Sequence, residues 1–87
     1  MKRVLFDTNV VLDVLLDRQP YVEASAAAWA AVETGVAEGM LAAHAVTAAA
    51  ARTAGCEFIV TRDPKGFRGS PVRSLTPEAV TPLLGDD

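Results

Sequence analysis

Two aspartates follow apolar segments that lie far apart in the chain. Asp7 ends the apolar run of "VLFDTN" (residues 4–9), and Asp63 closes "FIVTRD" (residues 58–63). In open parallel sheets, ligands bind beyond the carboxyl ends of the strands, so the two carboxylates converge if these segments are neighbouring strands. Oxygen ligands of this kind suit Mg²⁺ or Mn²⁺, with water completing the coordination. We therefore expect Asp7 and Asp63 to form a metal site, with Asn9 beside it to orient a carboxylate or a water.

A divalent ion at this place would be suited to phosphodiester hydrolysis. Such an ion polarises a phosphoryl oxygen, lowers the pKa of a bound water and orients in-line attack, and a carboxylate can accept the proton of that water. A purely structural interpretation stays open beside this one. Asp7 is then the cap of a following helix, and Asp63 opens a turn before Pro64, as Asp-Pro pairs commonly do.

Charge is unevenly distributed along the chain, whose formal net charge is −3. Residues 4–51 contain six acids and one base, whereas residues 62–73 contain four bases and one acid. Arg62, Lys65 and Arg68 lie close to Asp63 in the sequence and are suited to contact the phosphates of a nucleic acid. A solvated surface loop is the alternative interpretation of this basic segment.

Apolar and helical segments alternate along the sequence. Short apolar runs predict strands, and alanine-rich or capped segments between them predict helices. This alternation indicates an α/β domain in which a parallel sheet of about four strands lies between layers of helices, and we expect residues 1–87 to form one such domain. The expected strands are 3–7, 40–46, 57–61 and 72–75, the expected helices are 10–17, 22–36, 47–54 and 76–84, and residues 62–71 are expected to form a loop.

The composition bears on assembly and location. Hydrophobic residues make up 51% of the 87 residues, a high share for a domain that buries only about 60% of its unfolded surface. Surplus apolar surface favours a homo-oligomer such as a dimer, and a compact monomer with an alanine-rich core is the alternative. The single cysteine, Cys56, excludes an internal disulfide and fits a cytoplasmic location. The apolar runs are too short to span a membrane.

Two longer stretches of the sequence resemble the PIN domain, in the branch that includes VapC-type toxins. They are "VLFDTNVVLDVLLDRQPYVEAS" near the start and "GCEFIVTRDPKGFRGSPVRSLTPEAV" near the end, in that order. The resemblance implies a metal-dependent endoribonuclease that cuts RNA with Mg²⁺ or Mn²⁺, and an antitoxin protein as a possible partner. By this resemblance, Asp7 and Asp63 match the first and last acidic ligands. Asn9 matches the polar residue beside the first ligand, Thr8 matches a small hydroxyl residue expected to contact substrate, and Asp13 matches a structural helix acid.

The middle of the chain departs from the PIN pattern. PIN domains normally place further helices, a strand and the remaining acids between the second strand and the strand that ends at the last acid. Here ten residues without an acid separate Ala45 from Cys56. Fewer carboxylates lower metal affinity, so we expect either an attenuated nuclease or an inactive remnant that binds RNA or an antitoxin. An oligomeric partner could restore the missing cover of the shortened domain.

Overall fold

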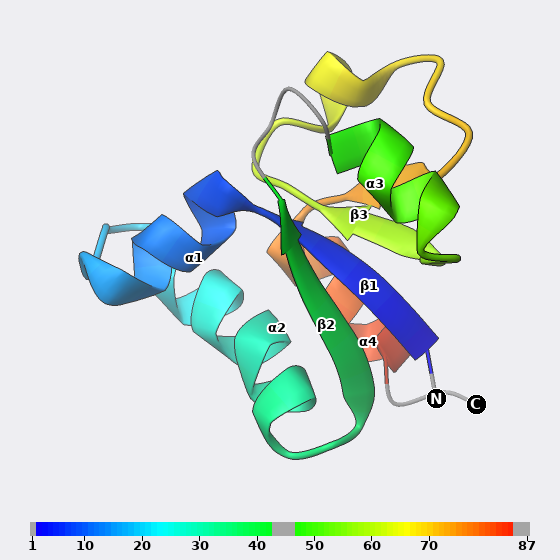
Figure 1. Ribbon diagram of the computed structural model, residues 1–87. Helices are drawn as coiled ribbons and strands as arrows, with labels where there is room; N and C mark the ends of the chain where they lie inside the picture. The colour runs from blue at the N-terminus through cyan, green and yellow to red at the C-terminus, as the bar shows by residue number, and fades with distance from the viewer. Residues whose placement is uncertain (1, 43–46, 85–87) are drawn as a thin grey trace.

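Helices separate the successive strands along the described chain. The computed structural model describes residues 2–42 and 47–84 (Figure 1). The strands are β1 (Lys2–Asp7), β2 (Ala37–Ala42), β3 (Phe58–Val60) and β4 (Arg73–Leu75). The helices are α1 (Thr8–Leu15), α2 (Val22–Glu33), α3 (Thr47–Thr53), the short 3₁₀-helix η2 (Pro64–Phe67) and α4 (Pro77–Leu84).

The sheet is parallel throughout, with the strand order β2-β1-β3-β4. β1 therefore lies inside the sheet, and Val4, Leu5 and Phe6 are all buried. Because helices cover both faces of a parallel sheet, an inner strand reads as a continuous apolar run without polar alternation. The α/β class with a four-stranded parallel sheet, predicted from the sequence, is confirmed.

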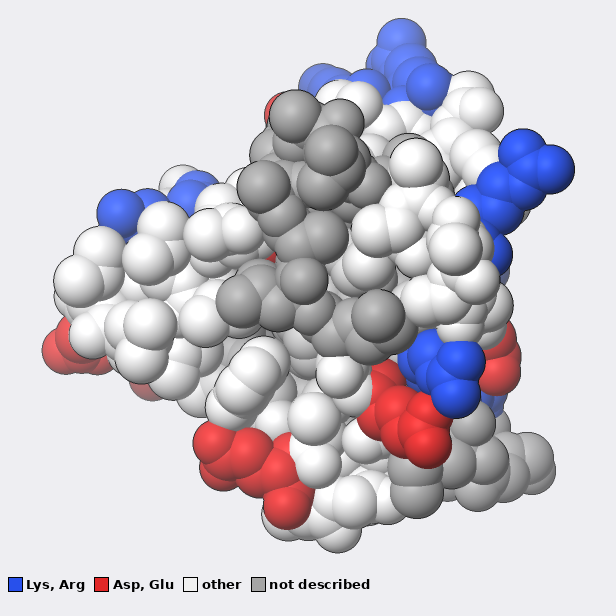
Figure 2. Space-filling model, viewed as in Figure 1, with Lys and Arg blue, Asp and Glu red and all other residues white. Residues whose placement is uncertain are grey.

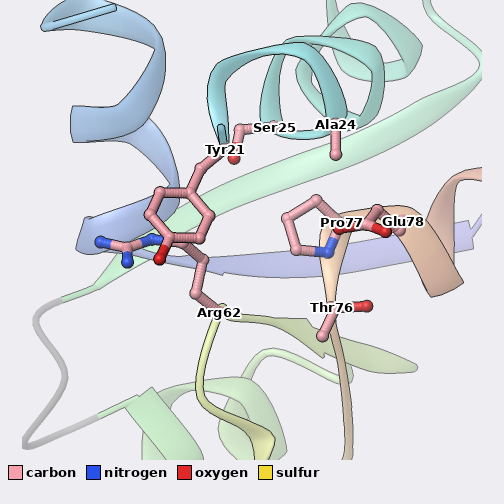
Figure 3. Close-up of a pocket in the computed structure, with 7 residues that line it drawn as sticks. All are labelled: Tyr21, Ala24, Ser25, Arg62, Thr76, Pro77 and Glu78. Carbon is pink, nitrogen blue, oxygen red and sulfur yellow. The ribbon is translucent and has the colours of Figure 1, made fainter. Parts of the chain in front are cut away.

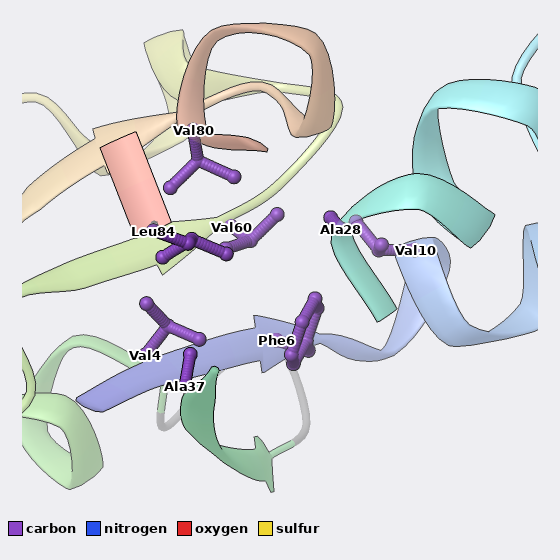
Figure 4. Packing of buried hydrophobic residues seen from close by; sticks show 8 residues of the cluster. All are labelled: Val4, Phe6, Val10, Ala28, Ala37, Val60, Val80 and Leu84. Carbon is purple, nitrogen blue, oxygen red and sulfur yellow. The ribbon is translucent and has the colours of Figure 1, made fainter. Parts of the chain in front are cut away.

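Two layers of helices enclose the sheet. Helices α2 and α4 pack together on one face and α1 packs on α2, whereas α3 packs on the opposite face of β1 and β3 (Figure 1). Successive side chains of a strand point to opposite faces, so β1 supplies both cores. Val4 and Phe6 join Val60, Val80 and Leu84 under α2 and α4 (Figure 4). The other core, under α3 and η2, contains Leu5, Ala51, Cys56, Ile59, Phe67 and Val72.

Several predicted boundaries are displaced in the structure. The expected strand at 40–46 begins earlier, at Ala37, because Ala37 pairs with Lys2 and the register with β1 sets where β2 starts; residues 43–46 lie outside the described part. The expected helix at 22–36 ends at Glu33, since Gly35 adopts a positive φ of 80° that only glycine reaches easily. The segment expected to be a loop, 62–71, contains η2.

Trp29 packs against one of the two cores and Cys56 lies in the other. Trp29 meets Phe6 edge to face, with ring centroids 5.2 Å apart and planes at 64°. Cys56 is buried, and its burial raises the pKa of the thiol although the nearby Arg3 charge acts to lower it. The thiol therefore stays protonated at neutral pH and serves as a packing group. Among the described helices, none is long and apolar enough to cross a membrane.

Candidate active site

Asp7 is the last residue of β1, and Thr61 immediately follows β3. Phe6 pairs with Val60 in the parallel register, which brings the next residue of each strand side by side at the carboxyl edge of the sheet. Thr61 Oγ1 donates a hydrogen bond of 3.0 Å to Asp7 Oδ2. Both side chains are buried, Asp7 with 1% of its surface exposed. The structure thus confirms that the segments ending in Asp7 and Asp63 are neighbouring strands.

Thr61 also fixes the start of the segment that carries Asp63. Its Oγ1 accepts a hydrogen bond of 3.1 Å from the backbone N–H of Asp63. One hydroxyl therefore connects the Asp7 carboxylate to the Asp63 backbone. The Asp63 residue itself is exposed, at the start of η2. This combination places one buried and one accessible carboxylate-bearing residue at the same edge of the sheet.

The capping interpretation of these acids is only partly supported. Asp7 stands at the position before α1, but within the described residues its side chain makes no capping hydrogen bond to that helix. Asp63 does open a turn, because Gly66 N–H donates to its carbonyl oxygen at 3.1 Å before the chain leaves η2. The turn is closed by the Asp63 backbone, and in the described part of the chain the Asp63 side chain makes no capping hydrogen bond to η2.

Helix α1 adds two buried oxygen acceptors one turn apart. Asn9 and Asp13 are four residues apart, the spacing that places side chains on one helical face. Within the part of the chain that the structure describes, Asn9 Oδ1 and Asp13 Oδ1 are buried and have no hydrogen-bond partner. A buried acceptor without a partner costs about 1–3 kcal/mol, so each of these oxygens is suited to a bound cation or water.

Asp13 is held by contacts that Asp7 does not share. It is completely buried, and Ser25 Oγ donates a hydrogen bond of 3.1 Å to its Oδ2. Arg62 Nε lies 2.8 Å from the same oxygen in an ion pair. Arg62 Nε makes no aligned hydrogen bond to any described residue, so charge holds this contact. The Arg62 Cζ atom also stacks over the Tyr21 ring, 4.3 Å from its centroid.

The remaining predicted site residues lie around this edge. Thr8 is the half-buried first residue of α1, and Lys65 and Arg68 are exposed on and just after η2. Figure 2 shows basic side chains along the upper and right-hand margins of this face, near η2 and α3. Arg62, predicted to contact phosphates, instead directs its side chain to Asp13 and Tyr21. Lys65 and Arg68 are the cations of this segment that face solvent beside Asp63.

The donor set fits a hard divalent ion with few protein ligands. Asp7, Asn9 and Asp63 offer carboxylate and amide oxygens, which Mg²⁺ and Mn²⁺ prefer, and the buried Asn9 Oδ1 has its acceptor sites unfilled. Among the described residues, no three histidines, cysteines or acids form a cluster. Mg²⁺ commonly keeps several waters and binds through one or two carboxylates, so this small set still matches its chemistry.

The sequence alone did not single out Thr61, Ser25 or Tyr21. Thr61 ends the predicted strand 57–61, and its position opposite Asp7 follows only from the register. Ser25 and Tyr21 reach the edge from α2 and the turn before it. A hydroxyl two residues before an acid, at the end of an apolar strand, is the one local signal that could have drawn attention to Thr61.

Comparison with known proteins gives one match. A family model described as the PIN domain matches residues 3–49, which is more than half of the chain. This stretch contains β1 from its second residue onward, α1, α2 and β2, and hence Asp7, Asn9 and Asp13. No curated protein and no solved structure matches the chain.

Proposed function

This chain belongs to the PIN domain family, and from that premise we propose that it is a divalent-metal-dependent endoribonuclease of the VapC toxin type. The proposal includes the central shortening, which leaves the enzyme attenuated. It also includes a cytoplasmic location and an antitoxin protein as a possible partner. The proposed substrate is RNA.

The observation that carries the proposal is the linkage at the sheet edge. Thr61 bonds the buried Asp7 carboxylate at 3.0 Å and the Asp63 backbone at 3.1 Å. Two acids 56 positions apart in sequence are thereby held by one side chain at the place where parallel sheets bind ligands. The bond to Thr61 fixes the Asp7 carboxylate, and the bond to the Asp63 N–H fixes where the Asp63 side chain begins, which lowers the cost of arranging a catalytic site.

Each residue of the site has a distinct role in the proposed reaction. Asp7, Asn9 and Asp63 would hold Mg²⁺ or Mn²⁺, and the ion when bound supplies a polarised phosphoryl oxygen and an acidified water. The Thr61 hydroxyl donates a hydrogen bond to Asp7 and so keeps one carboxylate oxygen oriented. Asp63 is exposed, so its carboxylate is accessible to accept a proton during hydrolysis.

The surrounding cations and hydroxyl position the RNA. Lys65 and Arg68 are exposed next to Asp63 and neutralise backbone phosphates. Thr8 follows Asp7 directly and offers a hydroxyl to the substrate. Arg62 follows the end of β3 and contacts Asp13 and Tyr21. Its proposed role is to hold these side chains in the surface on which the RNA lies.

Cleavage of a labelled single-stranded RNA with Mn²⁺ or Mg²⁺ tests the proposal. The wild type should cleave, and Asp7→Ala and Asp63→Ala should each lower the rate by on the order of a hundredfold, because loss even of groups that only orient metal ligands costs 10–100-fold. Glu57→Ala is the matched control, since Glu57 is an exposed acid at the opposite end of β3. Unchanged cleavage in both aspartate variants would show that the site lies elsewhere.

A second candidate is an inactive family member that binds RNA or an antitoxin. The observation that favours it is the ion pair of Asp13 with Arg62, which commits one of the buried acids to a cation of the chain itself. A wild type that binds neither Mn²⁺ nor Mg²⁺ and cuts no RNA would select this candidate.

The proposal includes a homodimer. Leu15 and Leu16 end α1 with 72% and 58% of their surfaces exposed, and Tyr21 and Val36 are also exposed. Apolar side chains of this size at one helix end favour association. Sedimentation at high protein concentration should give a dimer, and Leu15→Lys with Leu16→Lys should shift it to the monomer; a wild-type monomer would remove the dimer from the proposal.

A further inference from the structure

A small cleft opens beside the candidate active site, on the face of the sheet covered by α2 and α4. It has a volume of about 80 Å³ and lies between the start of α2, Arg62 and the start of α4. Arg62 stands between Thr61, which holds Asp7, and Asp63. Arg62, which lines the cleft, is thus the sequence neighbour of both Thr61 and Asp63. Because successive side chains of an extended chain alternate, the cleft lies on the opposite face of the sheet from the Thr61 side chain.

The walls of the cleft suit a flat ring. Tyr21, Ala24 and Pro77 provide its apolar lining, and in Figure 3 the Tyr21 ring lies with Arg62 on one side and Pro77 on the other. The Arg62 guanidinium occupies one face of the tyrosine at 4.3 Å. Aromatic and guanidinium planes are the surfaces on which proteins stack the unpaired bases of RNA.

Its charge disfavours a phosphate. The one cation in the lining, Arg62, is already paired with the buried Asp13 carboxylate 2.8 Å away. Glu78, in the first turn of α4, adds an exposed carboxylate to the lining. An anion would therefore meet an uncancelled negative charge, whereas a neutral ring would not.

Glu78 is the lining group of the cleft that distinguishes donors from acceptors, because the hydroxyls of Tyr21 and Thr76 can do both. The Glu78 carboxylate can only accept hydrogen bonds when ionised. The Ser25 hydroxyl is completely buried and donates a hydrogen bond of 3.1 Å to Asp13 Oδ2, so the Glu78 carboxylate is the acceptor that a ligand in the cleft meets. A ligand N–H donor complements the Glu78 carboxylate, and an exocyclic amino group supplies such donors.

We infer that this cleft binds one nucleobase of the RNA, and that it selects bases with an exocyclic amino group over uracil. Adenine, cytosine and guanine each offer an amino group to Glu78, as acidic side chains accept from cytosine N4 in DNA readout. Uracil offers a single N–H flanked by two carbonyl oxygens, and these oxygens would be repelled by the carboxylate oxygens of Glu78. This base site depends on the proposed function for the RNA that delivers the base, and it adds a specificity element to that function.

Binding of short RNAs in a chelating buffer tests the base site apart from cleavage. The probes are fluorescently labelled uridine heptamers in which the central residue is uridine, adenosine, cytidine or guanosine. At least one amino-bearing probe should bind the wild type about tenfold more tightly than all-uridine RNA, the scale expected for one hydrogen bond to a charged group. Glu78→Gln should reduce that preference to less than about twofold, because the amide presents a donor as well as an acceptor.

Glu57→Gln is the matched control, because it removes the same charge from the far end of β3 and should keep the tenfold preference. Tyr21→Ala should weaken binding of every probe through loss of the stacking surface, with thermal unfolding of each variant confirming that it is folded. Equal binding of all four probes, no binding, or a preference that survives in folded Glu78→Gln would overturn the base site. Preference without cleavage in Mn²⁺ would overturn the nuclease proposal alone.

Discussion

Two buried aspartates at the same end of the domain have partners of different kinds. Asp7 accepts a hydrogen bond from the neutral hydroxyl of Thr61, whereas the Asp13 carboxylate lies against the Arg62 guanidinium. Thr61 and Arg62 are consecutive, and consecutive residues of an extended chain point to opposite faces of the sheet. A single dipeptide after β3 thus contacts one buried acid on each side.

The difference separates an acid oriented for chemistry from an acid that holds the structure together. A hydroxyl orients a carboxylate without cancelling its charge. A guanidinium supplies the opposite charge itself, and burial makes that pairing expensive to break. Under the proposed function, Asp7 is the metal ligand of the two, and Asp13 is a structural acid held by the Arg62 guanidinium although its Oδ1 has no hydrogen-bond partner among the described residues.

The largest expected effect comes from breaking the Asp13 pair on the Arg62 side. Arg62→Met should lower the free energy of unfolding by about 3–5 kcal/mol, because it leaves a buried carboxylate without its cation. For a domain of this size that is a large part of the total stability. Urea unfolding followed by circular dichroism measures the change.

The matched control removes both charges together. The double variant Asp13→Leu with Arg62→Met should recover most of the lost stability, since replacing a whole buried ion pair by apolar groups is often close to neutral. If Arg62→Met alone costs less than about 1 kcal/mol, the pair is no stronger than a surface salt bridge and the assignment of Asp13 fails.

The Asp7 pairing can be weakened without touching either carboxylate. Thr61→Val keeps the shape of the side chain but removes the donor to Asp7 and the acceptor for the Asp63 N–H. It should cost about 1–3 kcal/mol of stability, the range for leaving a buried polar group unsatisfied. Thr61→Ser retains the hydroxyl and should restore part of the loss. Equal stability of the valine variant and the wild type would mean that Thr61 does not link the two acids.

The features of this sheet edge that could be predicted from the sequence are those that depend on residues close together in the chain. The two apolar segments ending in acids were recognisable because each pattern is local, and the register of β1 with β3 confirms that they are neighbours. The spacing of Asn9 and Asp13, four residues apart, is equally local and is enough to place them on one helical face. These inferences need only the periodicity of the chain.

The partner of each acid could not be predicted in the same way. Arg62 was assigned to the substrate because it opens a basic segment, yet it pairs with Asp13, 49 positions away. Thr61 was hidden at the end of a predicted strand, and its bond to Asp7 spans 54 positions. Such pairings depend on strand order and register, which a single sequence without related sequences leaves open.

The smallest expected effect concerns the outer partner of Arg62. Tyr21→Ala removes the ring under the guanidinium and should cost about 0.5–1 kcal/mol, the range for a cation–π contact at an exposed site. Tyr21→Phe keeps the ring and should leave the stability unchanged. Urea unfolding of the two variants side by side isolates the ring contribution. A loss as large as that of Arg62→Met would show that Tyr21, and not Asp13, is the main partner of Arg62.

Calorimetric titration with Mn²⁺ tests the division between the two acids most directly. Three proteins are compared: the wild type, Asp7→Asn, and the charge-balanced double variant Asp13→Leu with Arg62→Met, which keeps the fold while removing the second acid. The wild type should bind Mn²⁺, Asp7→Asn should bind at least about tenfold more weakly, equivalent to about 1.4 kcal/mol or more, and the double variant should stay within about threefold of the wild type. Equal loss of affinity in both variants would make Asp13 a metal ligand and contradict the division, and full affinity in Asp7→Asn would place the metal elsewhere.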